Sequence, residues 1–124
     1  MITHLRFESS PQAARSARHA LSEYLSSHGA LCGPDGERSE PSENALLAVS
    51  ELVTHVCRSP HASYRLGMLL EPGRLHLEVA GHQDGAGSSG PRAKVGFGPI
   101  GGLAGDWYMA TSSQGTTIRV TLPL

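Results

Sequence analysis

The sequence predicts an α+β fold, a two-layer sandwich in which helices cover one face of a mixed, mainly antiparallel sheet. Two patterns carry this prediction. Apolar residues recur every three or four positions within residues 14–25 and 45–56, which is the period of a helix, and they alternate with polar residues within 64–79 and 116–122, which is the period of a strand. The chain of 124 residues is long enough to bury one core, so we expect a single domain over residues 1–124.

Composition limits the classes of partner. Ten basic residues and eleven acidic residues give a formal net charge of −1, which provides no overall field to attract nucleic acid or an anionic membrane. No apolar run approaches the ~20 residues of a membrane span, and the N-terminus lacks the regions of a secretion signal. Two cysteines without C-x-x-C spacing predict reduced thiols. We therefore expect a cytoplasmic protein that binds neither nucleic acid nor membrane directly.

The N-terminal half predicts a short strand and two helices. Residues 3–7 alternate in polarity, as in a strand. The two serines before Pro11 supply a capping hydroxyl and proline suits the first helical position, so we expect the first helix to begin there and to end at Gly29. Residues 30–39 are rich in glycine, proline and charge and predict a loop. A second helix is predicted from Pro41 to Arg58.

The C-terminal half predicts two hairpins separated by a glycine-rich segment. Residues 64–70 and 75–79 alternate in polarity, and the Pro-Gly pair between them suits a tight turn. Residues 107–110 and 116–122 predict the second hairpin. Glycines crowd residues 81–106, where we expect a lid loop with little structure of its own.

Three polar residues of the second helix are candidates for chemistry. Glu51, His55 and Arg58 are separated by four and three residues, so they share one face opposite the apolar stripe. One interpretation is an ordinary solvated helix face. The other makes Glu51 a general base and His55 a contact to a metal or a phosphate. The segment is not the zinc-protease signature, which needs a second histidine before the glutamate.

Two glycine patterns could bring backbone N–H groups close to a phosphate. They are Asp84-Gly85-Ala86-Gly87 and Gly96-Phe97-Gly98, and residues without a Cβ allow such an approach. Neither the P-loop pattern nor the dinucleotide-binding glycine pattern after a strand is present. The glycine loop therefore indicates a nucleotide site only in combination with other motifs.

The order of elements and four local motifs resemble the anti-sigma-factor serine-kinase branch of the Bergerat-fold (GHKL) ATPases. Leu47 to Val56 resembles the N-box of that branch, and Gly96-Phe97-Gly98 resembles its lid glycines. Leu103-Ala104 with Trp107 resembles the end of the helix that follows the lid, and Gly115-Thr116 through Pro123 resembles the closing strand. The resemblance covers nearly the whole chain.

The resemblance implies roles for individual residues, and two of them depart from the family pattern. Glu51 takes the position of the general base, whereas His55 stands where the family has the asparagine that coordinates Mg²⁺. The adenine-reading aspartate falls on Gly81, and Asp84 lies one residue out of phase. Imidazole is a poor ligand for Mg²⁺, so we expect weak or absent binding of Mg·ATP. The further contacts that the resemblance implies to a nucleotide are those of Gly85, Gly87, Gly96, Gly98 and Thr116.

Two functions follow from this resemblance. The first is a regulator impaired in ATP binding, which controls transcription by binding a sigma factor or an anti-anti-sigma antagonist. The alternative is an active ATP-dependent serine kinase that phosphorylates such an antagonist. The resemblance also implies a homodimer.

Overall fold

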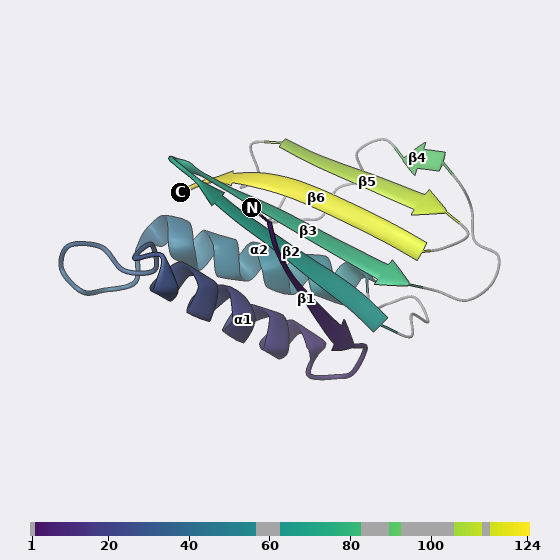
Figure 1. Cartoon of the computed structure of the whole chain (residues 1–124), viewed down its shortest axis with the longest axis horizontal. Coiled ribbons are helices and arrows are strands. Elements are labelled where there is room, and N and C mark those ends of the chain that lie inside the picture. The colour runs from purple at the N-terminus through teal and green to yellow at the C-terminus, as the bar shows by residue number, and fades with distance from the viewer. Residues whose placement is uncertain (1, 57–62, 83–89, 93–105, 113–114) are drawn as a thin grey trace.

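The computed structural model describes residues 2–56, 63–82, 90–92, 106–112 and 115–124. Its elements follow the predicted order and form one helical layer on one sheet (Figure 1). The α+β fold class is therefore confirmed. The elements are β1 (Thr3–Glu8), α1 (Ala13–Ser27), α2 (Glu40–Val56), β2 (Ser63–Glu71), β3 (Arg74–His82), β4 (Gly90–Arg92), β5 (Asp106–Ser112) and β6 (Gly115–Pro123).

The sheet has six strands in the order β1-β2-β3-β6-β5-β4. Each neighbouring pair is antiparallel, so the strands described contain no parallel pair of the kind a mixed sheet would have. Figure 1 shows α1 beside β1 and β2, with the β5–β4 edge on the far side of the sheet. Strand β4 lies within residues 81–106, and the ends of β3 and β5 also fall in that range. The expected lid is thus not a loop throughout, and its remaining residues lie outside the described part of the chain.

Helix α1 begins later than the sequence predicts. It starts at Ala13 with Gln12 as its N-cap, whereas Pro11 stands in the turn before it. The Ser10 hydroxyl accepts the Gln12 N–H at 3.2 Å, and the Ser10 carbonyl accepts the Ala13 N–H at 3.1 Å. The serine therefore closes the preceding turn and leaves the first helical turn without a side-chain cap. The predicted end is confirmed, because Gly29 follows the helix with φ of 68°.

The β2–β3 hairpin matches the prediction closely. Glu71 pairs with Arg74 across a two-residue turn of Pro72 and Gly73. Proline fixes φ near the value that the first turn position requires, and Gly73 adopts φ of 77°, which a side chain would disfavour. The hairpin brings the predicted alternation into register, so that Leu66, Leu77 and Val79 are buried under the helices, whereas Leu69 lies on the opposite face of the sheet.

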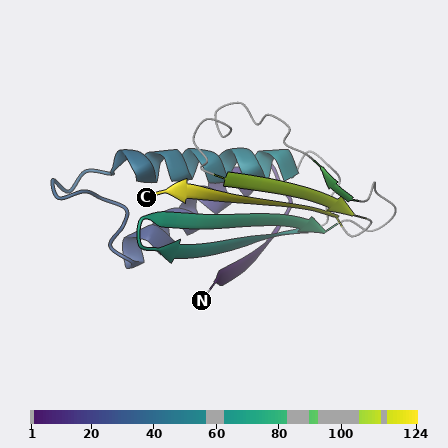
Figure 2. The same cartoon turned by 90° about the horizontal axis from the view of Figure 1, so that it is seen from above.

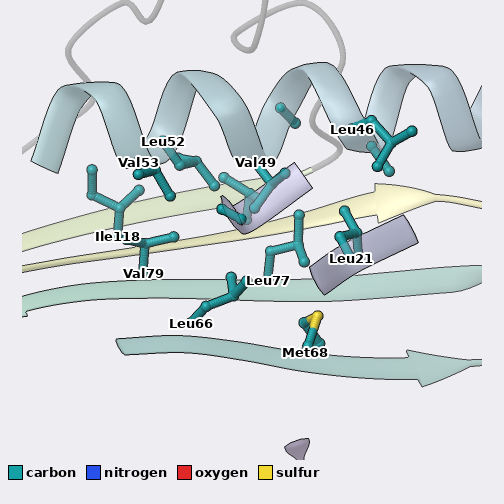
Figure 3. Packing of buried hydrophobic residues seen from close by; sticks show 14 of the residues in the cluster. Leu21, Leu46, Val49, Leu52, Val53, Leu66, Met68, Leu77, Val79 and Ile118 are labelled. Carbon is teal, nitrogen blue, oxygen red and sulfur yellow. The ribbon is translucent and has the colours of Figure 1, made fainter. Parts of the chain in front are cut away.

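The core lies between the helices and the sheet. Figure 3 shows Val49, Leu52 and Val53 of α2 pointing toward Val79 of β3 and Ile118 of β6, and all five side chains are fully buried. Helix α2 runs along the strands in both views of the molecule (Figure 2). Burial of such apolar area is the main stabilising contribution to the fold.

Hydrogen bonds of two tyrosine hydroxyls, in addition to apolar packing, hold helix α1 on the sheet. Its buried residues are two alanines and two leucines, which make a thin core face. The buried Tyr64 hydroxyl of β2 donates to the Ala13 carbonyl at 3.0 Å, and the Tyr24 hydroxyl accepts the Leu70 N–H at 3.0 Å. Hydrogen bonds between such distant segments fix the position of α1 over β2.

The sheet has a second face, which lies opposite the helices and is called the open face below. Along β6, Ile118, Val120 and Leu122 are buried under the helices, whereas Arg119 between them is exposed on the open face. Glu78 of β3 links Arg65 of β2 and Arg119 there, at 3.7 Å and 2.6 Å. Neither of the two helices described is long and apolar enough to cross a membrane.

Candidate functional site

Glu51 and His55 lie half-buried on α2, and neither of them lines the groove that α2 forms with α1. Leu46, Leu47 and Ser50 line that groove together with residues of α1. In a helix of 3.6 residues per turn, His55 stands about 140° around the axis from Ser50. Glu51 and His55 are one helical turn apart within α2, so they lie on the same side of that helix.

Gly81 and Thr116 are brought together by the sheet. They are direct register partners on β3 and β6, and Gly81 also pairs with the buried Tyr64 on its other side. Directly opposite residues of an antiparallel pair point to the same face, so both positions belong to the face that the helices cover. Two residues implied as nucleotide contacts, far apart in the sequence, are adjacent in the structure.

The last turn of α2 lies at the same end of the sandwich as this pair. Figure 3 shows Leu52 and Val53 above Val79 and Ile118. Gly81 follows Val79 by one step of the strand period, and Thr116 precedes Ile118 by the same step. His55, one turn of helix beyond Leu52, is therefore positioned toward the Gly81–Thr116 end.

The chemistry of these side chains does not fit the metal and adenine contacts that the resemblance implies. His55 offers an imidazole nitrogen where a hard cation requires oxygen, and Gly81 offers no carboxylate. The described residues contain no group of three or more metal-ligating side chains. The remaining predicted contacts, Asp84, Gly85, Gly87, Gly96 and Gly98, lie outside the residues that the structure describes.

A second surface, which the sequence did not predict, is a basic groove between α1 and α2. Its volume is about 500 Å³, and the groove is lined by Arg15, Arg18, His19, Ser22, Arg38, Glu43, Leu46, Leu47 and Ser50. Arg38 contacts Glu43 at 3.6 Å. Arg15 and Arg18 form no ion pair with the residues that the structure describes, and Leu47 is 42% exposed beside them.

Part of this groove could have been predicted from the sequence. Arg15 and Arg18 are three residues apart, so they stand on one face of α1, away from its buried stripe. Leu47 departs from the apolar stripe of α2 in the same way. That these two faces meet depends on how the helices pack, which the periodicity of either one does not determine.

Comparison with known proteins identifies the fold. No family model matches the chain, and no curated protein matches it. Among solved structures, the chain is similar to the crystal structure of the RsbU and RsbW domains of Rv1364c from Mycobacterium tuberculosis, with 20% sequence identity and a TM-score of 0.71 over 100% of this chain. The matching part of that protein is its RsbW domain. The two share a fold.

The extent of this likeness is limited to architecture. The chain spans 32% of the length of that Mycobacterium tuberculosis protein. At 20% identity the RsbW-like fold is established by the arrangement of helices and strands, not by individual side chains. The likeness therefore assigns no role to individual residues of this chain.

Proposed function

We propose that this protein is a transcriptional regulator that acts by binding another protein, either a sigma factor or an anti-anti-sigma antagonist. The observation that carries the proposal is the basic groove between α1 and α2. Arg15 and Arg18, which form no ion pair within the described part of the chain, lie beside the exposed side chain of Leu47 in a concave surface. Interfaces are enriched in arginine and in buried apolar anchors, and the RsbW-like fold supports a partner of this regulatory kind.

The groove indicates the chemistry of the partner. Two guanidinium groups attract carboxylates and can hold them in bidentate geometry. Leu47 adds an apolar contact within the same surface. We therefore infer a partner segment that presents acidic side chains around an apolar anchor.

Reversing the two charges is expected to weaken the partner complex. The double variant Arg15→Glu/Arg18→Glu should raise the Kd for the cognate sigma factor or antagonist by at least about tenfold, because carboxylates would then oppose carboxylates. Isothermal titration calorimetry with the purified candidate partners measures this Kd. Arg74→Glu, at an exposed position of β3, is the matched control and should leave the Kd unchanged. Equal Kd values for the wild type and the double variant would contradict the proposal.

Binding of Mg·ATP is proposed to be weak or absent. His55 and Gly81 support this, since neither provides the oxygen ligand that the resemblance requires at its position. The second candidate function, an active serine kinase, is favoured by Glu51, whose carboxylate lies on the same flank of α2 as His55.

The variant Glu51→Ala separates the two candidates. We expect it to leave the fold almost unchanged, because Glu51 is only half-buried, and to leave partner binding almost unchanged, because Glu51 is not among the residues that line the groove. Circular dichroism, partner titration and a phosphotransfer assay with γ-labelled ATP would be run on the variant and the wild type. Phosphotransfer by the wild type that disappears in Glu51→Ala would instead establish the kinase.

The homodimer implied by the resemblance is also a proposal. The open face offers a groove of about 890 Å³ whose lining includes two exposed apolar side chains, Ile2 and Tyr108. Exposed apolar surface of this kind supports association of two copies. Sedimentation equilibrium of the free protein measures the mass of the particle in solution.

A further inference from the structure

Strand β1 ends the sheet with an unpaired outer edge. It pairs with β2 on one side, and no other described strand pairs with it. Five of its six residues are exposed, including the apolar Leu5. An edge strand carries unpaired backbone N–H and C=O groups, and it can accept a further strand unless charged side chains that do not match the new strand, proline or a bulge prevent this. The sequence of β1, Thr-His-Leu-Arg-Phe-Glu, contains neither proline nor lysine.

Two arginines lie side by side on the open face next to this edge, and the exposed Glu8 ends β1 on the same face. Arg6 of β1 is the direct register partner of Arg65 of β2, and both are on the open face. Like charges directly opposite each other destabilise a strand pair. Arg6 forms no ion pair with the described residues. Arg65 reaches Glu78 only at 3.7 Å, whereas Arg119 holds the same carboxylate at 2.6 Å.

Arg65 also has a hydrogen-bond donor that no described residue satisfies. Its Nε atom is buried and has no hydrogen-bond partner among the described residues. The carboxylate of Glu78 therefore does not satisfy both arginines beside it. A second carboxylate next to Arg6 would reduce the repulsion across the β1–β2 pair.

The two faces of β1 differ in character. Thr3, Leu5 and Phe7 point to the helix side, since their register partners Met68, Leu66 and Tyr64 are buried there. Phe7 stacks on Tyr64 with ring centroids 5.1 Å apart. A strand added to this edge would meet an apolar surface at Leu5 on one face and a cation at Arg6 on the other.

A second copy of this chain is a poor match for the edge. Consider two copies whose β1 strands pair antiparallel, with both helical layers on the same side of the joined sheet. The two registers that keep most of the strand paired then place Arg6 opposite Arg6 or opposite His4 of the other copy. With the layers on opposite sides, Leu5 faces Arg6. Only a register that pairs no more than three residues of each β1 sets Arg6 opposite Glu8, so in the longer registers the charges of β1 favour a foreign strand over self-association.

We propose that the outer edge of β1 binds an extended acidic segment of another protein as an additional strand. Its carboxylate side chains lie beside Arg6 on the open face, and its alternate apolar side chains cover Leu5 on the helix side. Backbone hydrogen bonds supply affinity in such strand addition, and the alternating side chains supply specificity. This surface is separate from the groove between α1 and α2, so the proposal goes beyond the function proposed above.

The test uses three labelled octapeptides and the intact protein. In the first peptide glutamate and valine alternate, in the second lysine replaces glutamate, and the third is the first with every backbone nitrogen methylated. We expect the glutamate peptide to bind at least about tenfold more tightly than the lysine peptide, and the methylated peptide to lose binding, because it cannot complete the strand ladder. Fluorescence anisotropy gives the Kd values, and amide chemical shifts show whether Leu5 and Phe7 of β1 respond.

Charge reversal supplies the specific control. Arg6→Glu should reverse the preference toward the lysine peptide, and it should fold, since it replaces a like-charged register pair by an opposite one. Arg74→Glu, an exposed arginine on β3, should leave the preference unchanged. Three results would overturn the proposal: undiminished binding of the methylated peptide, equal effects of Arg6→Glu and Arg74→Glu, or self-association of the protein that Arg6→Glu abolishes.

Discussion

The double variant His55→Asn/Gly81→Asp is expected to bind Mg·ATP more tightly than the wild type by about two to four orders of magnitude. Asparagine restores an oxygen ligand for Mg²⁺ on α2. Aspartate restores a charged acceptor at the end of β3, on the helix side of the sheet and next to Thr116. Each restored contact is expected to contribute on the order of 1–3 kcal/mol, and these energies set the expected range.

Thermal unfolding with and without Mg·ATP measures this gain, since a ligand that binds only the native state raises Tm. The control is His55→Asn/Gly81→Asn, which has nearly the same volume but lacks the carboxylate, and should recover only the metal contact. No gain in either variant would show that substitutions at His55 and Gly81 alone do not rebuild the site. A wild-type Kd in the low micromolar range would contradict the proposal of impaired binding.

Leu52→Ala is expected to destabilise the protein by about 2–5 kcal/mol. The Leu52 side chain is fully buried between α2 and the sheet, where truncation leaves a cavity. Leu47→Ala, five residues earlier on the same helix but 42% exposed, is the matched control and should cost less than about 0.5 kcal/mol. Urea unfolding monitored by circular dichroism gives both values. Similar losses in the two variants would contradict the described packing of α2.

The elements that the sequence predicts well are those with a strong local signal. Both α2 and the β2–β3 hairpin have clear apolar periodicity, and the hairpin adds Pro72, which fixes φ, and Gly73, which tolerates φ of 77°. The start of α1 was predicted two residues too early, because Ser10 closes a turn of its own. Strand β4 was missed because Gly90-Pro91-Arg92 has no alternation of polarity, and proline there is tolerated at the edge of a sheet.

The candidate site likewise has features that the sequence predicts and features that it does not. The common flank of Glu51 and His55 follows from helical spacing alone. The adjacency of Gly81 and Thr116 requires the pairing of β3 with β6, and the basic groove requires the packing of α1 on α2. Such contacts between distant segments have no local pattern in the sequence.

The position of β6 in the middle of the sheet has a consequence for folding kinetics. Neighbouring strands β2 and β3 need only a two-residue turn, whereas the pairing of Leu77 with Val120 must close a long stretch of chain. The entropy of that closure is lost before the contact contributes any stabilisation. We therefore expect the β2–β3 hairpin to form early and the insertion of β6 to limit the rate at which the native state is reached.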